Sequence, residues 1–196
     1  MQRATVNDES LLFDGQARET FAFLENEWGM RCVQNSSNLV RWENESTFVI
    51  VFLGPVYQEV DVALGARAEP AVRPYALAEL IALADPDGAG EYRCPMVRTR
   101  SAVGRALAGC ADLLRRHGQA AVHGDQGTLR LLRDNRDKAG QAWESDLRAA
   151  VIRPRAAEAF RRGAYREAVD LFGRMEESLT PAERAKLAYA RRRAGH

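Results

Sequence analysis

Hydrophobic and polar residues alternate along residues 38–65 in the way that β-strands require. Because side chains alternate across a strand, Val40 and Trp42 share one face while Arg41 and Glu43 share the other. The segments are separated by turn residues, and the middle one is β-branched and aromatic on both faces, which is typical of a central strand. The pattern therefore predicts a three-stranded antiparallel sheet with one water-facing face, formed by residues 39–43, 47–53 and 59–64.

The residues before this sheet predict an amphipathic helix. Apolar residues recur at spacings of three and four between residues 11 and 28, at Leu12, Phe13, Ala17, Phe21, Leu24 and Trp28. Asp8 and Ser10 are candidate N-caps, and Gly29 follows the last apolar position. We expect this helix to cover the apolar face of the sheet.

The residues after the sheet read as helices. Helical periodicity covers residues 75–84, 101–117, 124–136 and 139–152, and we expect the last of these helices to end at Arg153, before Pro154. Residues 155–194 predict a helical pair, in which Thr180, Pro181 and Glu183 form a capping box with proline at the first helical position.

The predicted fold class is therefore α+β: a small antiparallel β-meander backed by an N-terminal helix and followed by an all-helical C-terminal half. Turn residues 85–90 are the clearest interruption of the pattern. They divide the chain into a meander unit, residues 1–90, and a helical unit, residues 91–196, which we expect to pack as one body.

Composition indicates a globular protein of the cytoplasm. The chain has 196 residues and is 46% hydrophobic, which is enough to form a core. Three cysteines without a CxxC pair favour neither a disulfide framework nor a zinc site. The first ten residues lack the pattern of a signal peptide, and no apolar run approaches the roughly 18 residues of a membrane span.

Charge is distributed unevenly along the chain. Residues 1–70 contain 11 Asp and Glu against 5 Arg, whereas residues 98–196 contain 12 against 21 Lys and Arg. An arginine-rich helical half could bind nucleic acid or another anionic ligand as a regulator. Acidic residues interleave with these arginines, however, and cations also gather at helix C-termini to offset the helix dipole, which favours a solvated surface as the explanation.

No catalytic motif is present in the sequence. His117 and His123, with Cys110 and Asp125, could form a metal site or a nucleophile and base, but nothing in their spacing fixes such a geometry. The chain has no GxSxG, GxxxxGK[ST] or GxGxxG motif. We expect no enzyme activity, no metal and no cofactor.

Two resemblances add to these patterns. Gly163, Tyr165, Ala168, Phe172 and Pro181 resemble the second half of a tetratricopeptide repeat, with methionine at position 175 where alanine is usual and the proline displaced by one. Because no second copy is found and stacking needs about three repeats, this resemblance implies one helical hairpin within residues 155–194.

The second resemblance concerns residues 11–125. The leading helix, the strands LVRWENESTFVIVFLG and YQEVDVALG, the helix YALAELIAL and the later segment ADLLRRHGQAAVHGD resemble small cytoplasmic bacterial immunity proteins of polymorphic toxin systems. That resemblance implies stoichiometric binding to another protein, such as a basic toxin domain. The candidate interface is the acidic strand face, Glu43, Glu45, Glu59 and Asp61, whose charge suits a basic partner.

Overall fold

The computed structural model describes residues 12–56, 58–69 and 71–195, and it divides into two compact units, Met1–Asn135 and Arg136–His196. The division falls later than the boundary predicted after residue 90. The reason is that the helices that follow residue 90 pack back on the sheet. The turn residues 85–90 therefore interrupt the sequence pattern without separating two units.

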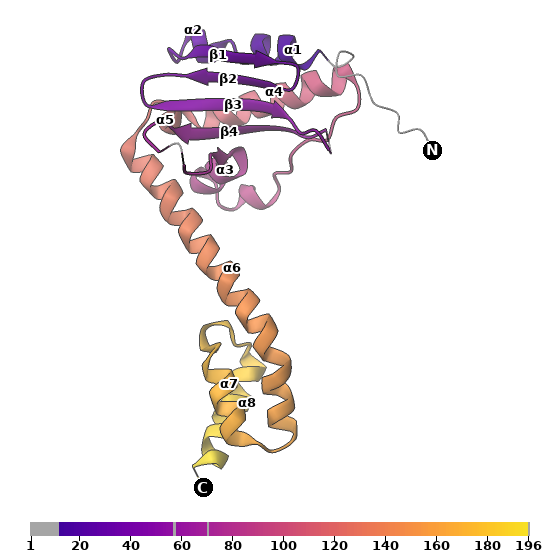
Figure 1. The fold of residues 1–196 in the computed structure, drawn as a ribbon, viewed down its shortest axis with the longest axis vertical. Helices are drawn as coiled ribbons and strands as arrows, with labels where there is room; N and C mark the ends of the chain where they lie inside the picture. Colours follow the sequence, from indigo (N-terminus) through magenta and orange to yellow (C-terminus); the bar gives the residue numbers. More distant parts are fainter. Residues whose placement is uncertain (1–11, 57, 70, 196) are drawn as a thin grey trace. The chain divides into compact units, whose positions relative to one another are not determined.

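The first unit is built on a five-stranded antiparallel meander (Figure 1). The strands follow one another in space as they do in the chain: β1 (Arg31–Ser36), β2 (Leu39–Glu43), β3 (Thr47–Leu53), β4 (Val60–Ala66) and β5 (Tyr75–Ala76). The predicted meander is confirmed as β2 to β4, and β1 and β5 extend it at its two edges. The α+β fold class is likewise confirmed.

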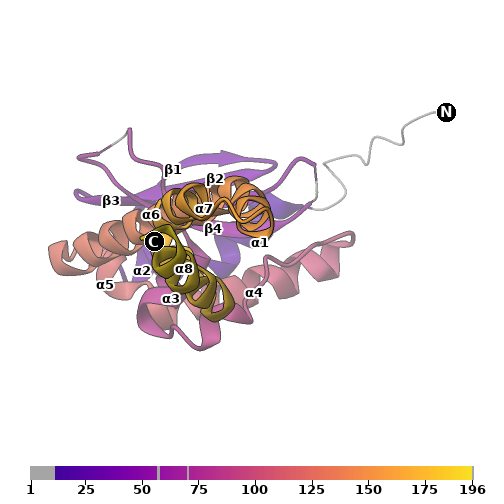
Figure 2. The ribbon, with the colours of Figure 1, turned by 90° about the horizontal axis from the view of Figure 1, so that it is seen from below.

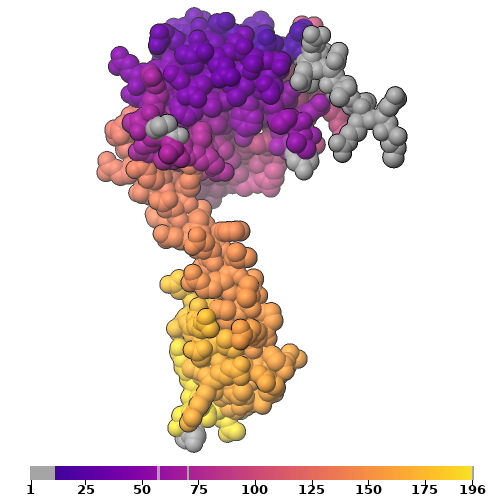
Figure 3. Space-filling view, in the orientation of Figure 1, coloured from indigo at the N-terminus to yellow at the C-terminus, as the bar shows by residue number. Residues whose placement is uncertain are grey.

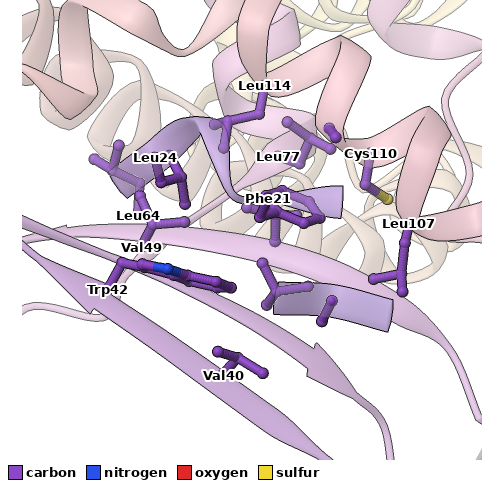
Figure 4. Close-up of a cluster of buried hydrophobic side chains, with 14 of the residues drawn as sticks. Phe21, Leu24, Val40, Trp42, Val49, Leu64, Leu77, Leu107, Cys110 and Leu114 are labelled. Carbon is purple, nitrogen blue, oxygen red and sulfur yellow. The ribbon is translucent and has the colours of Figure 1, made fainter. Parts of the chain in front are cut away.

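Helices cover one face of this sheet (Figure 2). They are α1 (Phe13–Thr20), α2 (Phe23–Asn26), α3 (Leu77–Ala84), α4 (Arg100–His117) and α5 (Gln119–Val122), with a short 3-10 turn, η2 (Gly88–Gly90), between α3 and α4. Inward side chains of β2 to β4 meet them in a core that includes Trp42, Val49 and Leu64 (Figure 4). Val40 and Trp42 are fully buried, as predicted.

The predicted helix over residues 11–28 is in fact two short helices, α1 and α2. Phe21, Phe23 and Trp28 are all buried, and residues two apart cannot share one face of a continuous helix. The break after Thr20 lets all three rings reach the core, where Phe23 and Trp28 meet edge to face with centroids 4.8 Å apart. The predicted N-caps Asp8 and Ser10 lie outside the described residues.

The second unit contains most of α6 (Gln126–Arg161), followed by α7 (Tyr165–Gly173), the 3-10 turn η3 (Glu176–Ser178) and α8 (Pro181–Ala194). The predicted helices over residues 124–136 and 139–152 are one helix of 36 residues, and the predicted stop at Arg153 is wrong because α6 continues through Pro154. Proline removes one hydrogen bond, but apolar residues recur on both sides of it at Ala149, Ile152, Ala156 and Ala159, and their burial against α7 and α8 keeps the helix continuous.

The region of residues 155–194, predicted to form a pair of helices, contains three helical segments: the end of α6, α7 and α8. Ala168 and Phe172 are buried in its core, and Gly163, with φ of 75°, turns the chain between α6 and α7. Thr180 and Glu183 form the predicted capping box at the start of α8. Among the described residues, none of the helices is both long and apolar enough to span a membrane.

Candidate functional site

The face of the sheet opposite the helices carries a mixture of apolar and charged side chains. We call this surface the open face, and it is made by Leu39, Arg41, Glu43, Phe48, Ile50, Phe52, Asp61, Ala63 and Gly65. Among the described residues of the first unit, no helix lies in front of it in the space-filling view (Figure 3). Cross-strand pairing arranges these residues in three rows across β2, β3 and β4.

Two adjacent rows of the open face contain most of its partly exposed apolar side chains. Ile50 lies between Arg41 and Ala63, and Phe52 lies between Leu39 and Asp61. The side chains of Leu39, Ile50, Phe52 and Ala63 are partly exposed and do not belong to the core cluster under the helices. A sheet face that meets only water is usually polar, so apolar residues on this face require another explanation.

Two arginines lie against Glu43 and Phe48, in the row nearest the β2–β3 turn. The Arg41 guanidinium lies 4.0 Å from the centroid of the Phe48 ring and donates to Glu43 Oε1 at 2.8 Å. Arg67 approaches the other oxygen of Glu43 at 3.6 Å and also donates to the carbonyl oxygen of Asn44 at 3.0 Å. Glu43 is therefore held between two guanidinium groups, and its charge is largely neutralised.

The β2–β3 turn is fixed by contacts with the end of α5. Asn44 Nδ2 and Thr47 Oγ1 donate to the carbonyl oxygen of Val122 at 2.9 and 2.5 Å, and the Asn44 side chain accepts the backbone N–H groups of Ser46 and Thr47. Beside this turn lies a polar hollow of about 510 Å³, lined by residues that include Arg31, Arg67 and His123. These contacts hold one end of the open face rigid.

A second polar cluster lies at the β4 end of the open face. Asp61 Oδ1 accepts the backbone N–H of Val62 at 2.8 Å and the Tyr92 hydroxyl at 3.4 Å, and Tyr92 also lies 4.0 Å from Cys110 Sγ. Burial raises the pKa of Asp61 above its ordinary value, more strongly than these hydrogen bonds lower it. Burial also raises the pKa of Cys94 to about 11 and that of Cys110 to about 12. Both thiols are thus protonated at neutral pH, and protonated thiols are poor nucleophiles.

The four acidic residues proposed as an interface lie at two separate places. Glu43 and Glu45 are at the β2–β3 turn, where Glu45 is exposed, whereas Glu59 and Asp61 are at the start of β4, where Glu59 forms an isolated bridge with Met96. Glu43 and Asp61 share the open face, but the row formed by Arg41, Ile50 and Ala63 lies between them. The acidic residues therefore flank an apolar centre and do not form one acidic patch.

Three of the four candidate metal or catalytic residues of the sequence make structural contacts, and the fourth, His117, is partly exposed at the end of α4. His123 packs against Trp28 with ring centroids 5.9 Å apart, and Asp125 accepts both the backbone N–H and the hydroxyl of Thr128 at 2.7 Å, at the start of α6. Cys110 is buried against β4. Within the residues that the structure describes, no group of three or more His, Cys, Asp or Glu is arranged to hold a metal ion.

Arginines of the second unit are partly engaged in ion pairs. This unit contains 14 Lys and Arg against 9 Asp and Glu. Arg153 pairs with Glu183, Arg162 with Glu158 and Glu167, and Arg191 with Glu176. The arginine-rich surface is therefore interrupted by acids, which weakens a continuous phosphate-binding track.

Sequence reasoning placed Arg41 on the outward face of the sheet, but it missed Arg67 and the exposed apolar residues of the open face. Arg67 lies 24 residues from Glu43 in the chain, and only the turn after β4 brings the two together. The signal for the apolar centre was present in β3, since Phe48, Ile50 and Phe52 are apolar on the face that the helices do not cover. No family model, curated protein or solved structure matches this chain.

Proposed function

We propose that the protein is a non-enzymatic protein-binding protein and that the open face contacts its partner. One observation carries the proposal: Leu39, Ile50 and Phe52 lie in two adjacent rows of the open face and are partly exposed, on a side of the sheet where the first unit's helices do not pack. Charged residues of both signs surround them. An apolar centre within a polar rim is the usual anatomy of a protein–protein interface.

The charge of the first unit favours a basic partner. It contains 18 Asp and Glu against 14 Lys and Arg, and Glu45 and Glu59 lie at opposite ends of the open face. Rim charges act mainly on the rate of association, while buried apolar contacts supply most of the affinity. The resemblance to immunity proteins suggests a basic toxin domain, neutralised by one-to-one binding, as the partner.

Titration of purified proteins tests the proposal. The products of genes that neighbour the coding sequence are purified and each is titrated with this protein by calorimetry. For a product that binds one to one, Ile50→Thr with Phe52→Thr should weaken binding by at least about tenfold, because a hot spot contributes roughly 1.4 kcal/mol or more. Threonine keeps the strand propensity while it removes apolar area.

A matched control is available on α6 within the first unit. Leu131 has 52% of its surface exposed and does not belong to the open face, so Leu131→Gln removes a comparable apolar side chain elsewhere. This variant should bind as the original chain does. If the original chain and the Ile50/Phe52 variant bind the partner with equal affinity, the proposal is contradicted. If the protein binds only nucleic acid, with an affinity that falls steeply as salt rises, a nucleic-acid-binding regulator is favoured instead.

The rim is tested separately with Glu45→Lys and Glu59→Lys. These positions are better suited than Glu43 and Asp61, whose carboxylates are held by Arg41 and Arg67 or by Tyr92 and the Val62 backbone. Stopped-flow measurements should show slower association of the double variant at low salt and a smaller difference at high salt. If the association rate is indifferent to salt and to the double variant, the rim does not steer the partner.

A further inference from the structure

Helix α6 carries a second apolar stripe on the side away from the core of the second unit. Trp143, Leu147 and Val151 follow one another at intervals of four residues and are 65%, 52% and 67% exposed. Ala156, which is fully buried, lies nine residues after Leu147 and therefore about 180° around the helix. The core of this unit contacts only the opposite side of α6. Packing within the unit therefore does not explain why these three exposed residues are apolar.

The charges beside the stripe change sign at Leu147. Glu144 and Asp146 precede it, and Arg148 and Arg155 follow it, and all four are exposed. Two parallel copies of this segment would bring like charges together. Two antiparallel copies would place the acidic half of each segment against the basic half of the other, which is electrostatically complementary.

An antiparallel pair centred on Leu147 also matches the apolar side chains. Leu147 would meet its own counterpart at the two-fold axis, and Trp143 would lie opposite the second copy's Val151. Glu144 lies on the same flank of the stripe as Arg148 and would lie beside the second copy's Arg148. Large and small side chains then face each other, which lets the two helices pack closely. A two-fold interface of this kind is self-complementary, as the commonest homodimers are.

We propose that the chain forms an antiparallel homodimer through residues 143–151 of α6. The stripe runs about 12 Å along the helix axis, so the contact is smaller than the roughly 800 Å² per partner of a standard interface. A weak dimer that dissociates on dilution is expected.

Sedimentation and tryptophan fluorescence of the full chain test this directly. Trp28 and Trp42 are buried, so Trp143 is the exposed tryptophan of the three. Raising the protein concentration should increase the sedimenting mass toward twice 21.8 kDa, and over the same range it should shift the emission to shorter wavelength and protect it from acrylamide. A chain that remains monomeric to its solubility limit would overturn the proposal.

Variants test the register and orientation. Leu147→Glu places two carboxylates at the two-fold axis and should abolish the dimer, whereas Leu131→Glu, on the same helix but outside the stripe, should leave it unchanged. Glu144→Arg alone and Arg148→Glu alone should each weaken association at low salt, because each places like charges together. The double variant Glu144→Arg/Arg148→Glu should restore it. Association that persists in Leu147→Glu, or a double variant as weak as both single variants, would overturn the antiparallel arrangement.

Discussion

The ring of Phe48 on β3 lies across Gly65 on β4, its direct cross-strand neighbour. A Cβ atom on residue 65 would come within 2.9 Å of three ring carbon atoms, closer than side chains tolerate. Glycine at this position lets the ring lie flat on the sheet, where Arg41 covers its other side. Phe48 is consequently 7% exposed although it belongs to the open face.

Gly65→Ala should therefore destabilise the first unit by about 1 to 3 kcal/mol, because the added methyl group overpacks the site. Urea unfolding of the full chain, followed by circular dichroism, measures this loss. In a Phe48→Leu background the same substitution should be much milder, because the smaller side chain leaves room. Equal losses in the two backgrounds would mean that the ring is not the group that excludes a side chain at residue 65.

Asp61→Asn should make the protein more stable at neutral pH. Burial raises the pKa of Asp61, so its charged form is less favourable in the folded chain than in the unfolded one. The native chain therefore loses stability as pH rises from the ordinary Asp value near 3.8 through the raised value, and the asparagine variant does not. Unfolding free energies measured across this range should show a difference that is smallest at the acidic end.

The same experiment with Asp61→Ala separates charge from hydrogen bonding. Alanine removes the acceptor of the Val62 backbone N–H and of the Tyr92 hydroxyl, whereas asparagine can keep both. The alanine variant should be less stable than the asparagine variant at every pH. If both variants behave alike, the hydrogen bonds at Asp61 add little to stability.

The meander could be predicted from sequence because strand alternation is a local signal. Val40 and Trp42 alternate with Arg41 and Glu43, and this alternation alone specifies which side chains face the core. The outer strand β5 has only two residues, too few for any alternation to be detected. The short helix α2 was missed for a different reason, since its start depends on three aromatic rings packing in the core.

The open face could be predicted only in part. Alternation identified Glu43 and Asp61 as outward residues, but it could not show that Arg67, from the turn after β4, neutralises Glu43. The continuity of α6 was beyond local reasoning as well. Proline at residue 154 is a strong local signal against helix, and it is outweighed by the burial of Ile152 and Ala156 against distant parts of the chain.

Ala168→Leu should destabilise the second unit by about 1 to 3 kcal/mol. Ala168 is fully buried in α7 within the cluster that also contains Ala156 and Phe172, so a larger side chain has no space. Thermal unfolding of the full chain measures the loss. Ala185→Leu in α8 adds the same atoms at an exposed position and should change stability little. An unchanged melting curve for Ala168→Leu would count against close packing of α7.

Pro154→Ala should stabilise the helical unit by about 1 to 3 kcal/mol. Residue 154 lies inside α6, where proline cannot donate to the carbonyl group four residues earlier and its ring crowds that turn. Alanine restores the hydrogen bond and has the highest helix propensity. Urea unfolding at low protein concentration, where association is negligible, gives the free energy. A loss of stability would show that the proline ring makes a packing contact worth more than the missing hydrogen bond.

Arg153→Met should destabilise the junction between α6 and α8 in a pH-dependent way. Glu183 is 8% exposed, and it accepts the Arg153 Nε–H at 2.7 Å and the backbone N–H of Thr180 at 2.8 Å. Burial opposes ionisation of Glu183, but these donors together hold its pKa below the ordinary value near 4.5. The ion pair therefore contributes stability above pH 4.5 that is lost as pH falls through the lowered value.

Methionine keeps much of the length of the arginine stem and removes the guanidinium, which leaves Glu183 with fewer donors. At neutral pH we expect a loss of about 1 to 2 kcal/mol, discounted because Arg153 is itself partly exposed. The loss should shrink in acid, where Glu183 is protonated in both proteins. Arg162→Met breaks exposed ion pairs with Glu158 and Glu167 and should have little effect at any pH. If the two variants lose the same stability, or if the loss from Arg153→Met does not depend on pH, the buried carboxylate is not what makes Arg153 important.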